Sequence, residues 1–315
     1  MPAIKRILII GASGFIGRRL TKKLAEAGHG VVVAKRRGSV TSEVAGENLK
    51  IVILPDDTYD GLPGAISGTA IDMIVNCAAY GVHPHDRDPN QMYIVNVALP
   101  VALVELAARK QAGLIHLGSS AEYAAGGLES PVSEDATVEA YKFYGGSKYC
   151  GGALMNLKAR AIDVPSAVLR LFNVFGPGEG DHRLLPTLTG KLHRRERAAL
   201  SAGNQIRDFI YVDDVVAAIV AAMNALHDGL LSGGEFFNVS TGIGTPVRQF
   251  VMLAASAMKA DPGLLGFGDV PVRPDEVPLL VGNNQRFAAA TGWEPKFSLS
   301  AGIQAAISEA EMDKA

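Results

Sequence analysis

The sequence contains few cysteines, only two in 315 residues. Cys77 and Cys150 lie in apolar stretches, and their spacing matches neither a disulfide framework nor a paired metal site. We therefore expect two small buried side chains in a protein of a reducing compartment, and no bound metal.

An excess of charge of one sign is also missing. The chain has 30 Lys and Arg against 32 Asp and Glu, which gives a formal charge of −2. Such a balance creates no global field that would attract nucleic acid or an anionic membrane. We expect neither as a partner, so an anionic ligand would have to meet cations that are placed locally.

Long apolar runs are absent as well. The run Ile7–Ile10 near the N-terminus is shorter than the core of about 7 to 15 residues that a secretory signal needs. The runs Ala98–Ala108 and Val215–Ala222 fall short of the about 20 residues that span a bilayer. The sequence predicts a cytoplasmic protein with no membrane segment.

What the chain does contain is an alternation of short apolar runs with helical patterns. This alternation is typical of β-α-β units, and so of an α/β fold with a doubly wound parallel sheet of the Rossmann type. The predicted strands are Lys5–Ile10, Val31–Ala34, Leu49–Leu54, Ile71–Cys77, Leu114–Leu117 and Ser166–Leu171. The predicted helices are Phe15–Ala27, Met92–Arg109 and Tyr141–Ala161.

After Phe172 the pattern changes to loops rich in Gly and Pro and to shorter mixed elements. We therefore expect a cofactor-binding domain over residues 1–172 and a smaller α/β substrate-binding lobe over residues 173–315. The segment Glu235–Val239 predicts a strand that returns to the main sheet, so the two units should interleave. The sequence shows no internal repeat.

A glycine loop follows the first predicted strand: Gly11, Gly14 and Gly17 stand three residues apart at the start of a helix. In a dinucleotide fingerprint the first glycine permits a tight turn, the second the approach of a pyrophosphate, and the third close packing of helix and strand. The free N–H groups of the helix would then face the phosphates. The alternative, a loop that merely closes a turn, is less consistent with this position.

The second strand ends in Lys35, Arg36 and Arg37. An acidic residue at this point binds the ribose 2′-hydroxyl of NAD, whereas cations suit the 2′-phosphate of NADP. The sequence thus favours NADP(H), with NAD(H) as the second choice. A solvated basic turn is the other interpretation of this triplet.

Tyr144 and Lys148 lie four residues apart, hence on one face of the predicted helix. A nearby ammonium favours the ionised phenol, so we expect Lys148 to lower the pKa of Tyr144. Such a pair is common by chance. It gains weight from Ser119, which follows a predicted strand at the carboxyl edge of the sheet and can donate to a substrate carbonyl.

Together these motifs resemble the extended short-chain dehydrogenase/reductase family of nucleotide-sugar epimerases, dehydratases and ketoreductases. The resemblance covers nearly the whole chain. The motifs that carry it are Gly11-x2-Gly14-x2-Gly17, Asn76-Cys-Ala-Ala79, Asn96-Val97, Gly118-Ser-Ser-Ala-Glu-Tyr123, Tyr144-x3-Lys148, Leu169-Arg-Leu-Phe-Asn173, Arg207-Asp-Phe-Ile-Tyr-Val-Asp213 and Gly292-Trp-Glu-Pro295.

The resemblance implies a role for each matching position. The implied catalytic residues are Ser119, Tyr144 as the acid/base, and Lys148, which also holds the nicotinamide ribose. The implied cofactor-binding residues are Gly11, Ser13, Gly14, Phe15, Ile16, Gly17, Arg36, Arg37, Ala78, Ala79, Asn96, Tyr144 and Lys148. The implied substrate-binding residues are Ser119, Ser120, Asn173, Arg207 and Arg273, the last three on the diphosphate of a nucleotide sugar. A homodimer through the helix of Tyr144 is also implied.

Three reactions of this family remain to be separated. A dehydratase usually carries two acids after the catalytic hydroxyl, where this chain has Ser120 and Ala121, so dehydration is disfavoured. The basic triplet favours an exchangeable NADPH, and so a reductase of a keto sugar nucleotide such as a 4-keto-6-deoxy hexose. A 4-epimerase is the alternative. A non-catalytic NADP(H) sensor would not need Ser119, Tyr144 and Lys148.

Two further clusters carry less weight. The loop with His83, His85 and Asp86 is typical of an ordinary polar loop rather than a metal site, and its position after the fourth predicted strand allows a substrate contact as the other interpretation. The basic segment His193–Arg197 is typical of a solvated face, with nucleotide recognition as the other interpretation.

Overall fold

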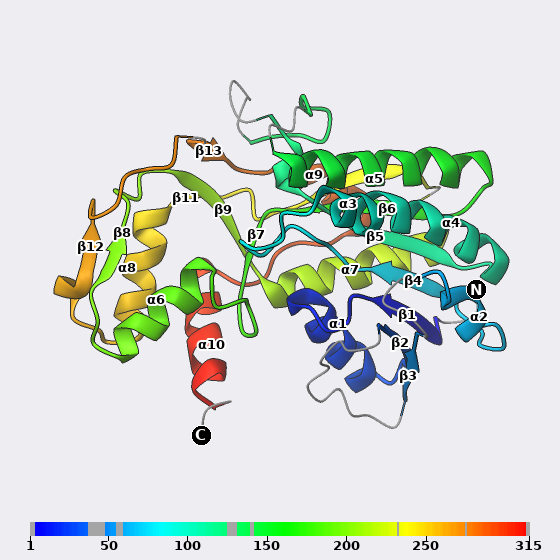
Figure 1. The fold of residues 1–315 in the computed structure, drawn as a ribbon, viewed down its shortest axis with the longest axis horizontal. Helices are drawn as coiled ribbons and strands as arrows, with labels where there is room; N and C mark the ends of the chain where they lie inside the picture. Colours follow the sequence, from blue (N-terminus) through cyan, green and yellow to red (C-terminus); the bar gives the residue numbers. More distant parts are fainter. Residues whose placement is uncertain are drawn as a thin grey trace.

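A computed structural model describes residues 4–36, 48–54, 59–124, 131–138, 142–231, 233–274 and 276–312. Its main sheet has seven strands in the order β10-β6-β5-β4-β1-β2-β3, all parallel (Figure 1). The strands are β1 Arg6–Ile10, β2 Gly30–Lys35, β3 Leu49–Ile53, β4 Met73–Asn76, β5 Gly113–Ser119, β6 Ser166–Leu171 and β10 Glu235–Val239. The predicted fold class, a doubly wound parallel sheet, is confirmed.

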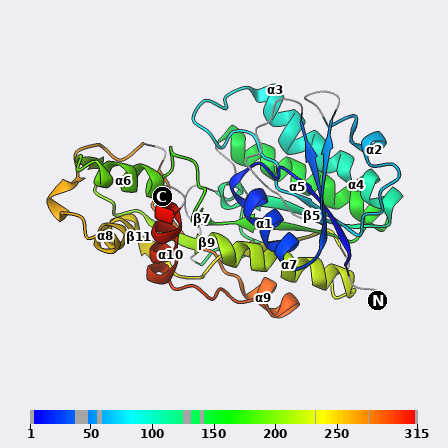
Figure 2. The same cartoon turned by 90° about the horizontal axis from the view of Figure 1, so that it is seen from below.

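The sheet is apolar on both faces because alternate side chains of each strand enter different cores. In β1, Ile7 and Ile9 pack into one hydrophobic cluster, and Leu8 and Ile10 into the other. Helices cover each face, as Figure 2 shows edge-on. One layer contains α1 Phe15–Glu26, α7 Val212–His227 and α9 Gln285–Thr291. The other contains α2 Leu62–Ala65, α3 Pro89–Met92, α4 Leu99–Lys110 and α5 Phe143–Ala161.

Beyond β6 the chain builds a second group of elements, on the left in Figure 1, and returns once to the main sheet through β10. The strands outside the main sheet are β7 Asn173–Phe175, β8 Ala198–Leu200, β9 Ile206–Tyr211, β11 Gly244–Pro246, β12 Leu265–Phe267 and β13 Leu279–Leu280. The helices of this group are α6 Leu184–His193, α8 Val247–Ala257 and α10 Leu299–Met312, and it includes the 3₁₀ turn η3 Pro262–Leu264. A second 3₁₀ turn, η2 Ser120–Glu122, directly follows β5.

The helix predicted over Met92–Arg109 is longer than expected. It begins at Pro89, passes through one π-helical segment, η1 Tyr93–Ala98, and ends at Lys110. An 18-residue window of this 22-residue helix has a mean hydropathy of 1.6, so by length and composition alone the helix could span a membrane, which the shorter apolar run Ala98–Ala108 did not predict. Half of the apolar window is buried against the protein, and α4 packs on α5, β4 and β5. Such burial is typical of a core helix.

The expectation of two buried cysteines is also wrong for one of them. Cys77 is partly buried, and burial raises the pKa of its thiol to about 12. Cys150 is exposed on α5, because it lies on the side of the helix that faces away from the sheet.

Candidate active site

The glycine loop between β1 and α1 is confined on two sides. Gly11 has a φ of +77°, and a Cβ added there would lie 2.6 Å from the backbone N of Ala78. At Gly17 a Cβ would lie 2.2 Å from the carbonyl oxygen of Gly11. Any larger residue at either position would push the loop away from β4 or from α1.

The N-terminus of α1 offers hydrogen-bond donors beside this loop. Gly14 is the N-cap, and no side chain caps the helix, so the first-turn amides of Phe15, Ile16 and Gly17 have no side-chain acceptor. Free N–H groups and the positive end of the helix dipole suit a dinucleotide pyrophosphate. Phe15, Ile16 and Gly17 form this first turn, and their contact with a cofactor stays a prediction.

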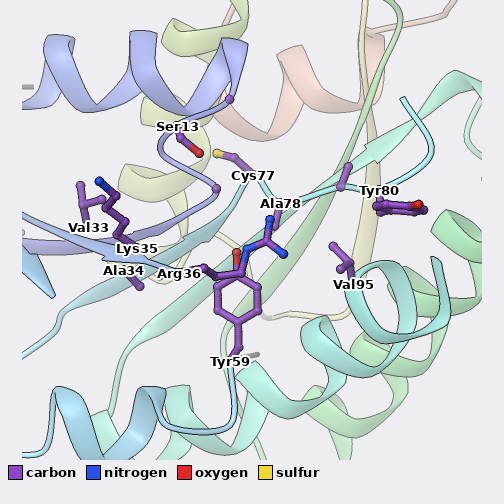
Figure 3. A pocket seen from close by; sticks show the side chains of 13 residues that line it. Ser13, Val33, Ala34, Lys35, Arg36, Tyr59, Cys77, Ala78, Tyr80 and Val95 are labelled. Carbon is purple, nitrogen blue, oxygen red and sulfur yellow. The ribbon is translucent and has the colours of Figure 1, made fainter. Parts of the chain in front are cut away.

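A cavity opens next to the loop (Figure 3). Its lining includes residues from the ends of β1, β2 and β4: Gly11, Ser13, Gly14, Val33, Ala34, Lys35, Arg36, Tyr59, Cys77, Ala78, Ala79, Tyr80 and Val95. Six of these were predicted cofactor-binding residues. Tyr59 was missed because it follows β3 in a stretch with no motif, and the predicted Arg37 lies outside the described residues.

No acidic side chain lines the described part of this cavity; Lys35 and Arg36 lie there instead. The Arg36 guanidinium carbon is 6.0 Å from the centroid of the Tyr59 ring, and Figure 3 shows the guanidinium pointing into the cavity. Burial raises the pKa of the Tyr59 phenol, and Arg36 opposes that shift. Arg36 thus places a positive charge in the cavity beside Tyr59.

Asn96 is fully buried in the π-helical segment and does not line the cavity. Its Oδ1 accepts from the Tyr80 N–H at 2.9 Å, and its Nδ2 donates to the Tyr80 carbonyl at 2.8 Å and to Ser147 Oγ at 2.9 Å. These bonds use the Asn96 amide within the protein, and its contact with the cofactor stays a prediction. Asn96 instead fixes Tyr80, a lining residue, against α5.

Tyr144 and Ser119 are brought together at the carboxyl end of β5. The two side chains form a hydrogen bond that lowers the phenol pKa, but burial dominates and raises the pKa of Tyr144 to about 12. The expectation that Lys148 lowers this pKa is therefore wrong for the geometry seen here. The remaining electrostatic effects on Tyr144 come from Glu122, which raises its pKa, and Arg183, which lowers it.

Lys148 is almost completely buried, and its Nζ lies 3.2 Å from Nε2 of His116 on β5. Burial lowers the pKa of Lys148 to about 8, although Glu122 and Cys77 oppose that shift. His116 was not predicted as a site residue. The available signal was a single histidine inside the otherwise apolar strand Leu114–Leu117.

The turn that carries Ser119 is fixed by hydrogen bonds to Glu122 and within the turn. The Ser119 N–H donates to Glu122 Oε1 at 2.8 Å, and the Ala121 N–H donates to Ser119 Oγ at 3.2 Å, which forms a capping box. Glu122 is turned into the protein, where Arg170 binds it, so it does not replace the acids that are missing at Ser120 and Ala121.

A second cavity of about 530 Å³ lies between the two groups of elements. Asn173, Arg207 and Arg273 line it, whereas Ser119 and Ser120 do not. Arg207 forms an ion pair with Glu276 and also donates to the Ile206 carbonyl, so both contacts use N–H groups of its guanidinium. Other polar residues of the lining were not predicted: Arg87, Glu179, His182, Arg183, Ser201, Gln205 and Glu276.

The His83–Asp86 loop and the basic segment His193–Arg197 lie at different cavities. The rings of His83 and His182 lie 4.7 Å apart at the edge of this cavity, and Pro84 and Arg87 line it. His193 and Arg194 line a different cavity near α10. No group of three or more potential ligands for a metal ion occurs among the described residues.

Comparison with known proteins decides the family. A sequence model described as the NAD dependent epimerase/dehydratase family matches residues 7–240. The chain belongs to this family. It is thus an NAD(P)-dependent enzyme of the extended short-chain dehydrogenase/reductase type, in a family whose members modify nucleotide sugars.

Relatives in this family match the chain over nearly its full length. It is 27% identical to CDP-abequose synthase of Salmonella typhimurium over 304 residues, 95% of this chain and 96% of the relative. It is 29% identical to UDP-glucose 4-epimerase of Mycolicibacterium smegmatis, again over 95% and 96%. The crystal structure of UDP-glucose 4-epimerase with UDP-glucose from Thermotoga maritima superposes with a TM-score of 0.86 at 25% identity, covering 98% and 99% of the two chains.

The site fits the cofactor of the epimerase/dehydratase family on its own geometry. The confined glycine loop, the uncapped start of α1 and the adjacent cavity provide room and donors for a dinucleotide. Ser119, Tyr144 and Lys148 lie beyond it on β5 and α5. The arrangement can bind a nicotinamide dinucleotide and present a hydroxyl pair to a carbonyl group.

Proposed function

We propose that this enzyme reduces the carbonyl group of a keto sugar nucleotide, in particular a 4-keto-6-deoxy hexose, with NADPH. The observation that carries the proposal is the end of β2, where Lys35 and Arg36 line the cofactor cavity and no acid is present in its described part. Two cations there favour NADPH, which exchanges with a reducing pool rather than remaining bound through a catalytic cycle.

Each residue then has a distinct task. NADPH, when bound, would be the source of the hydride that reduces the carbonyl carbon. Tyr144 donates its phenolic proton to the carbonyl oxygen, and the Ser119 hydroxyl, which is hydrogen-bonded to Tyr144, holds that oxygen in place. A phenol with a pKa of about 12 is protonated at neutral pH, as this role requires. Lys148 holds the nicotinamide ribose.

The substrate would lie in the second cavity, which the elements beyond β6 line on one side. Arg207 and Arg273 hold the diphosphate with Asn173, since guanidinium groups match phosphate oxygens in a chain with no global positive charge. In domain terms, residues 1–172 bind the cofactor and residues 173–315 mainly bind the substrate. The names of two relatives support a 4-keto substrate: dTDP-6-deoxy-L-talose 4-dehydrogenase (NAD(P)(+)) of Kitasatospora kifunensis and GDP-6-deoxy-D-talose 4-dehydrogenase of Aggregatibacter actinomycetemcomitans.

A 4-epimerase is the second candidate, supported by the relatives that bear that name. An epimerase returns the hydride to the same substrate and consumes no cofactor. The residues at Ser120 and Ala121 continue to disfavour a dehydratase, because neither can remove a proton beside a ketone.

We also infer a homodimer through α5. Phe143, Leu154 and Leu157 are 63%, 48% and 60% exposed on this helix, and Tyr93 is 61% exposed on the adjacent η1. A contiguous apolar face of this kind is typical of a subunit interface. A second copy of the same face would cover it symmetrically.

The deciding experiment follows cofactor oxidation and sugar stereochemistry together. The enzyme is incubated with NADPH and a panel of nucleotide sugars and their 4-keto derivatives. Stoichiometric oxidation of NADPH with formation of a 4-hydroxy sugar is expected. Formation of a 4-epimer without net loss of NADPH would replace the reductase by the epimerase, and cofactor binding without any turnover would point to a sensor.

A further inference from the structure

His116 lies at the centre of a buried chain of polar side chains from three elements. It is fully buried on β5, between Asn76 at the end of β4 and Lys148 on α5. Asn76 Nδ2 is 3.1 Å from His116 Nδ1, and Lys148 Nζ is 3.2 Å from His116 Nε2. The proposed function gives a role to Lys148 but none to His116 or Asn76.

The direction of these hydrogen bonds follows from a backbone group. The Ala78 N–H donates to Asn76 Oδ1 at 3.1 Å, which leaves the amide Nδ2 of Asn76 to face His116. An amide nitrogen can only donate, so His116 Nδ1 must accept. A neutral imidazole with an accepting Nδ1 carries its proton on Nε2. His116 therefore points an N–H at Lys148.

An N–H that faces Lys148 distinguishes between the two forms of that side chain. An ammonium has three donors and no lone pair, so it cannot accept from His116, whereas an uncharged amine can. His116 does not escape the conflict by gaining a second proton, because burial keeps its pKa well below the ordinary value and Lys148 lowers it further.

The other groups around Lys148 act as follows. Burial lowers its pKa to about 8, and Glu122 and Cys77 oppose this. The influence of Glu122 is limited because Arg170 on β6 binds it, and the Cys77 thiol, with a pKa of about 12, is uncharged. Tyr144, one turn away on α5, is uncharged as well, with a pKa of about 12. No uncompensated anion among the described residues therefore holds the ammonium in place.

We propose that His116, fixed by Asn76, is a positioning residue that favours the uncharged amine of Lys148, and that cofactor binding above neutral pH is coupled to uptake of one proton. This inference rests on the proposed function in one respect, the contact between Lys148 and the cofactor ribose. When the cofactor binds, the hydrogen bond from the His116 N–H to Lys148 Nζ breaks, and Nζ takes a proton from solvent. The resulting ammonium then donates to ribose hydroxyls.

The first test measures protons that accompany cofactor binding. NADPH and NADH are each titrated calorimetrically into the full chain at several pH values between about 7 and 9, in buffers of different ionisation enthalpy. NADH is the control because it lacks the 2′-phosphate of NADPH. That phosphate has a pKa of its own and could take up or release protons on binding. Uptake should rise towards about one proton per site as the pH passes about 8. Binding without pH-dependent uptake overturns the inference, and the proposed function then stands.

The second test needs no cofactor and so remains decisive if neither dinucleotide binds, an outcome that would defeat the proposed function instead. Histidine labelled with ¹⁵N is incorporated, and the signal of His116 among the seven histidines is assigned by its loss in His116→Phe. We expect the Nε2–H tautomer at about pH 9, and a shift of its resonances near pH 8 that disappears in Lys148→Met. An Nδ1–H tautomer, or no such shift in the wild type, overturns the inference.

A matched pair of variants at Asn76 separates this role from simple packing. In Asn76→Asp the carboxylate accepts from Nδ1–H, so the tautomer should reverse and the inflection of Lys148 should move to higher pH. In Asn76→Leu neither nitrogen is fixed, and both tautomers should appear. Unchanged Nε2–H signals in both variants would show that Asn76 does not determine which His116 nitrogen carries the proton.

Discussion

Arg170 and Glu122 form an ion pair in the interior, directly beneath the candidate active site. Arg170 Nε donates to Glu122 Oε2 at 2.8 Å, and the side chains are only 2% and 0% exposed. The other oxygen of Glu122 accepts from the Ser119 N–H. Burial raises the pKa of Glu122, and Arg170 opposes this shift. Among the described residues, Arg170 is the cation at hydrogen-bond distance from Glu122. The ion pair therefore connects the Ser119 turn to β6.

Removing one member of this pair should be strongly destabilising. Arg170→Met leaves a buried carboxylate without its cation, and we expect a loss of about 3 to 5 kcal/mol in the free energy of unfolding. Urea denaturation followed by circular dichroism measures this. Arg109→Met breaks an exposed pair with Glu105 and serves as the control, for which the denaturation midpoint should hardly move. Equal midpoints for both variants would refute a structural role for the buried pair.

Lys148 should lower stability at neutral pH while serving the reaction. Its pKa is about 8 in the folded chain against an ordinary value of 10.5, so between these values the unfolded chain binds more protons and wild-type stability rises with pH. Below pH 8 the buried ammonium is fully destabilising. Lys148→Met should therefore raise the free energy of unfolding by about 1 to 3 kcal/mol at pH 7, and by less near pH 10. Urea denaturation at both pH values tests this, and a pH-independent difference would contradict it.

The parallel sheet could be predicted because its strands are buried on both faces and each is followed by a helix or a turn signal. The six strands predicted in the first half lie within two residues of their positions in the structure. The π-helical segment Tyr93–Ala98 could not be predicted, since it arises where Gly151 of α5 packs on it: a Cβ there would lie 1.8 Å from the Asn96 carbonyl oxygen. That constraint is tertiary and leaves no periodic signal.

The candidate site shows the same division. Gly11 and Ser119 could be placed because each follows a predicted strand, whereas Arg207 was implied only by the resemblance of its motif to the family. Tyr59 and His116 could not, because their importance depends on neighbours from other elements. The pKa of Tyr144 was mispredicted for the same reason: helical spacing brings Lys148 onto the same face but does not reveal that His116 binds its Nζ.

Tyr144→Phe should separate chemistry from binding. The variant loses the proton donor but keeps the ring, so kcat should fall by about 10² to 10⁴ while the affinity for NADPH stays nearly constant. Tyr149→Phe on the same helix is the matched control, because its ring packs near Phe236. Steady-state rates and cofactor titrations measure both. Near-normal turnover of Tyr144→Phe would remove the phenol from the mechanism.

The proposed dimer can be tested through Cys150. This thiol is exposed on α5, and it follows Phe143 by seven residues and precedes Leu154 by four, so all three share one stripe of the helix. A short bismaleimide should link two chains through Cys150, whereas the Cys77 thiol, with a pKa of about 12, is unreactive. Cys150→Ser should give no cross-linked dimer. A monomeric mass by light scattering would contradict the interface.

The final prediction concerns the choice of cofactor, and it depends on Arg36. This guanidinium lies in the cavity near the Tyr59 ring, where an NAD-specific site would carry a carboxylate. If Arg36 contributes about 1.5 kcal/mol to a 2′-phosphate, Arg36→Ala should weaken NADPH binding by about 10-fold and leave NADH unchanged.

The effect should also depend on salt. A guanidinium–phosphate contact at a cavity mouth is screened over about 8 to 10 Å at physiological ionic strength, so the preference of the wild type for NADPH should shrink as salt is added. Lys22→Ala, an exposed cation on α1 outside the cavity lining, controls for a general change in charge. Calorimetric titration of both cofactors into the three proteins measures all of these effects. If wild type binds NADH as tightly as NADPH, the cations at the end of β2 do not select the cofactor, and the epimerase becomes the better proposal because it needs no exchangeable reductant.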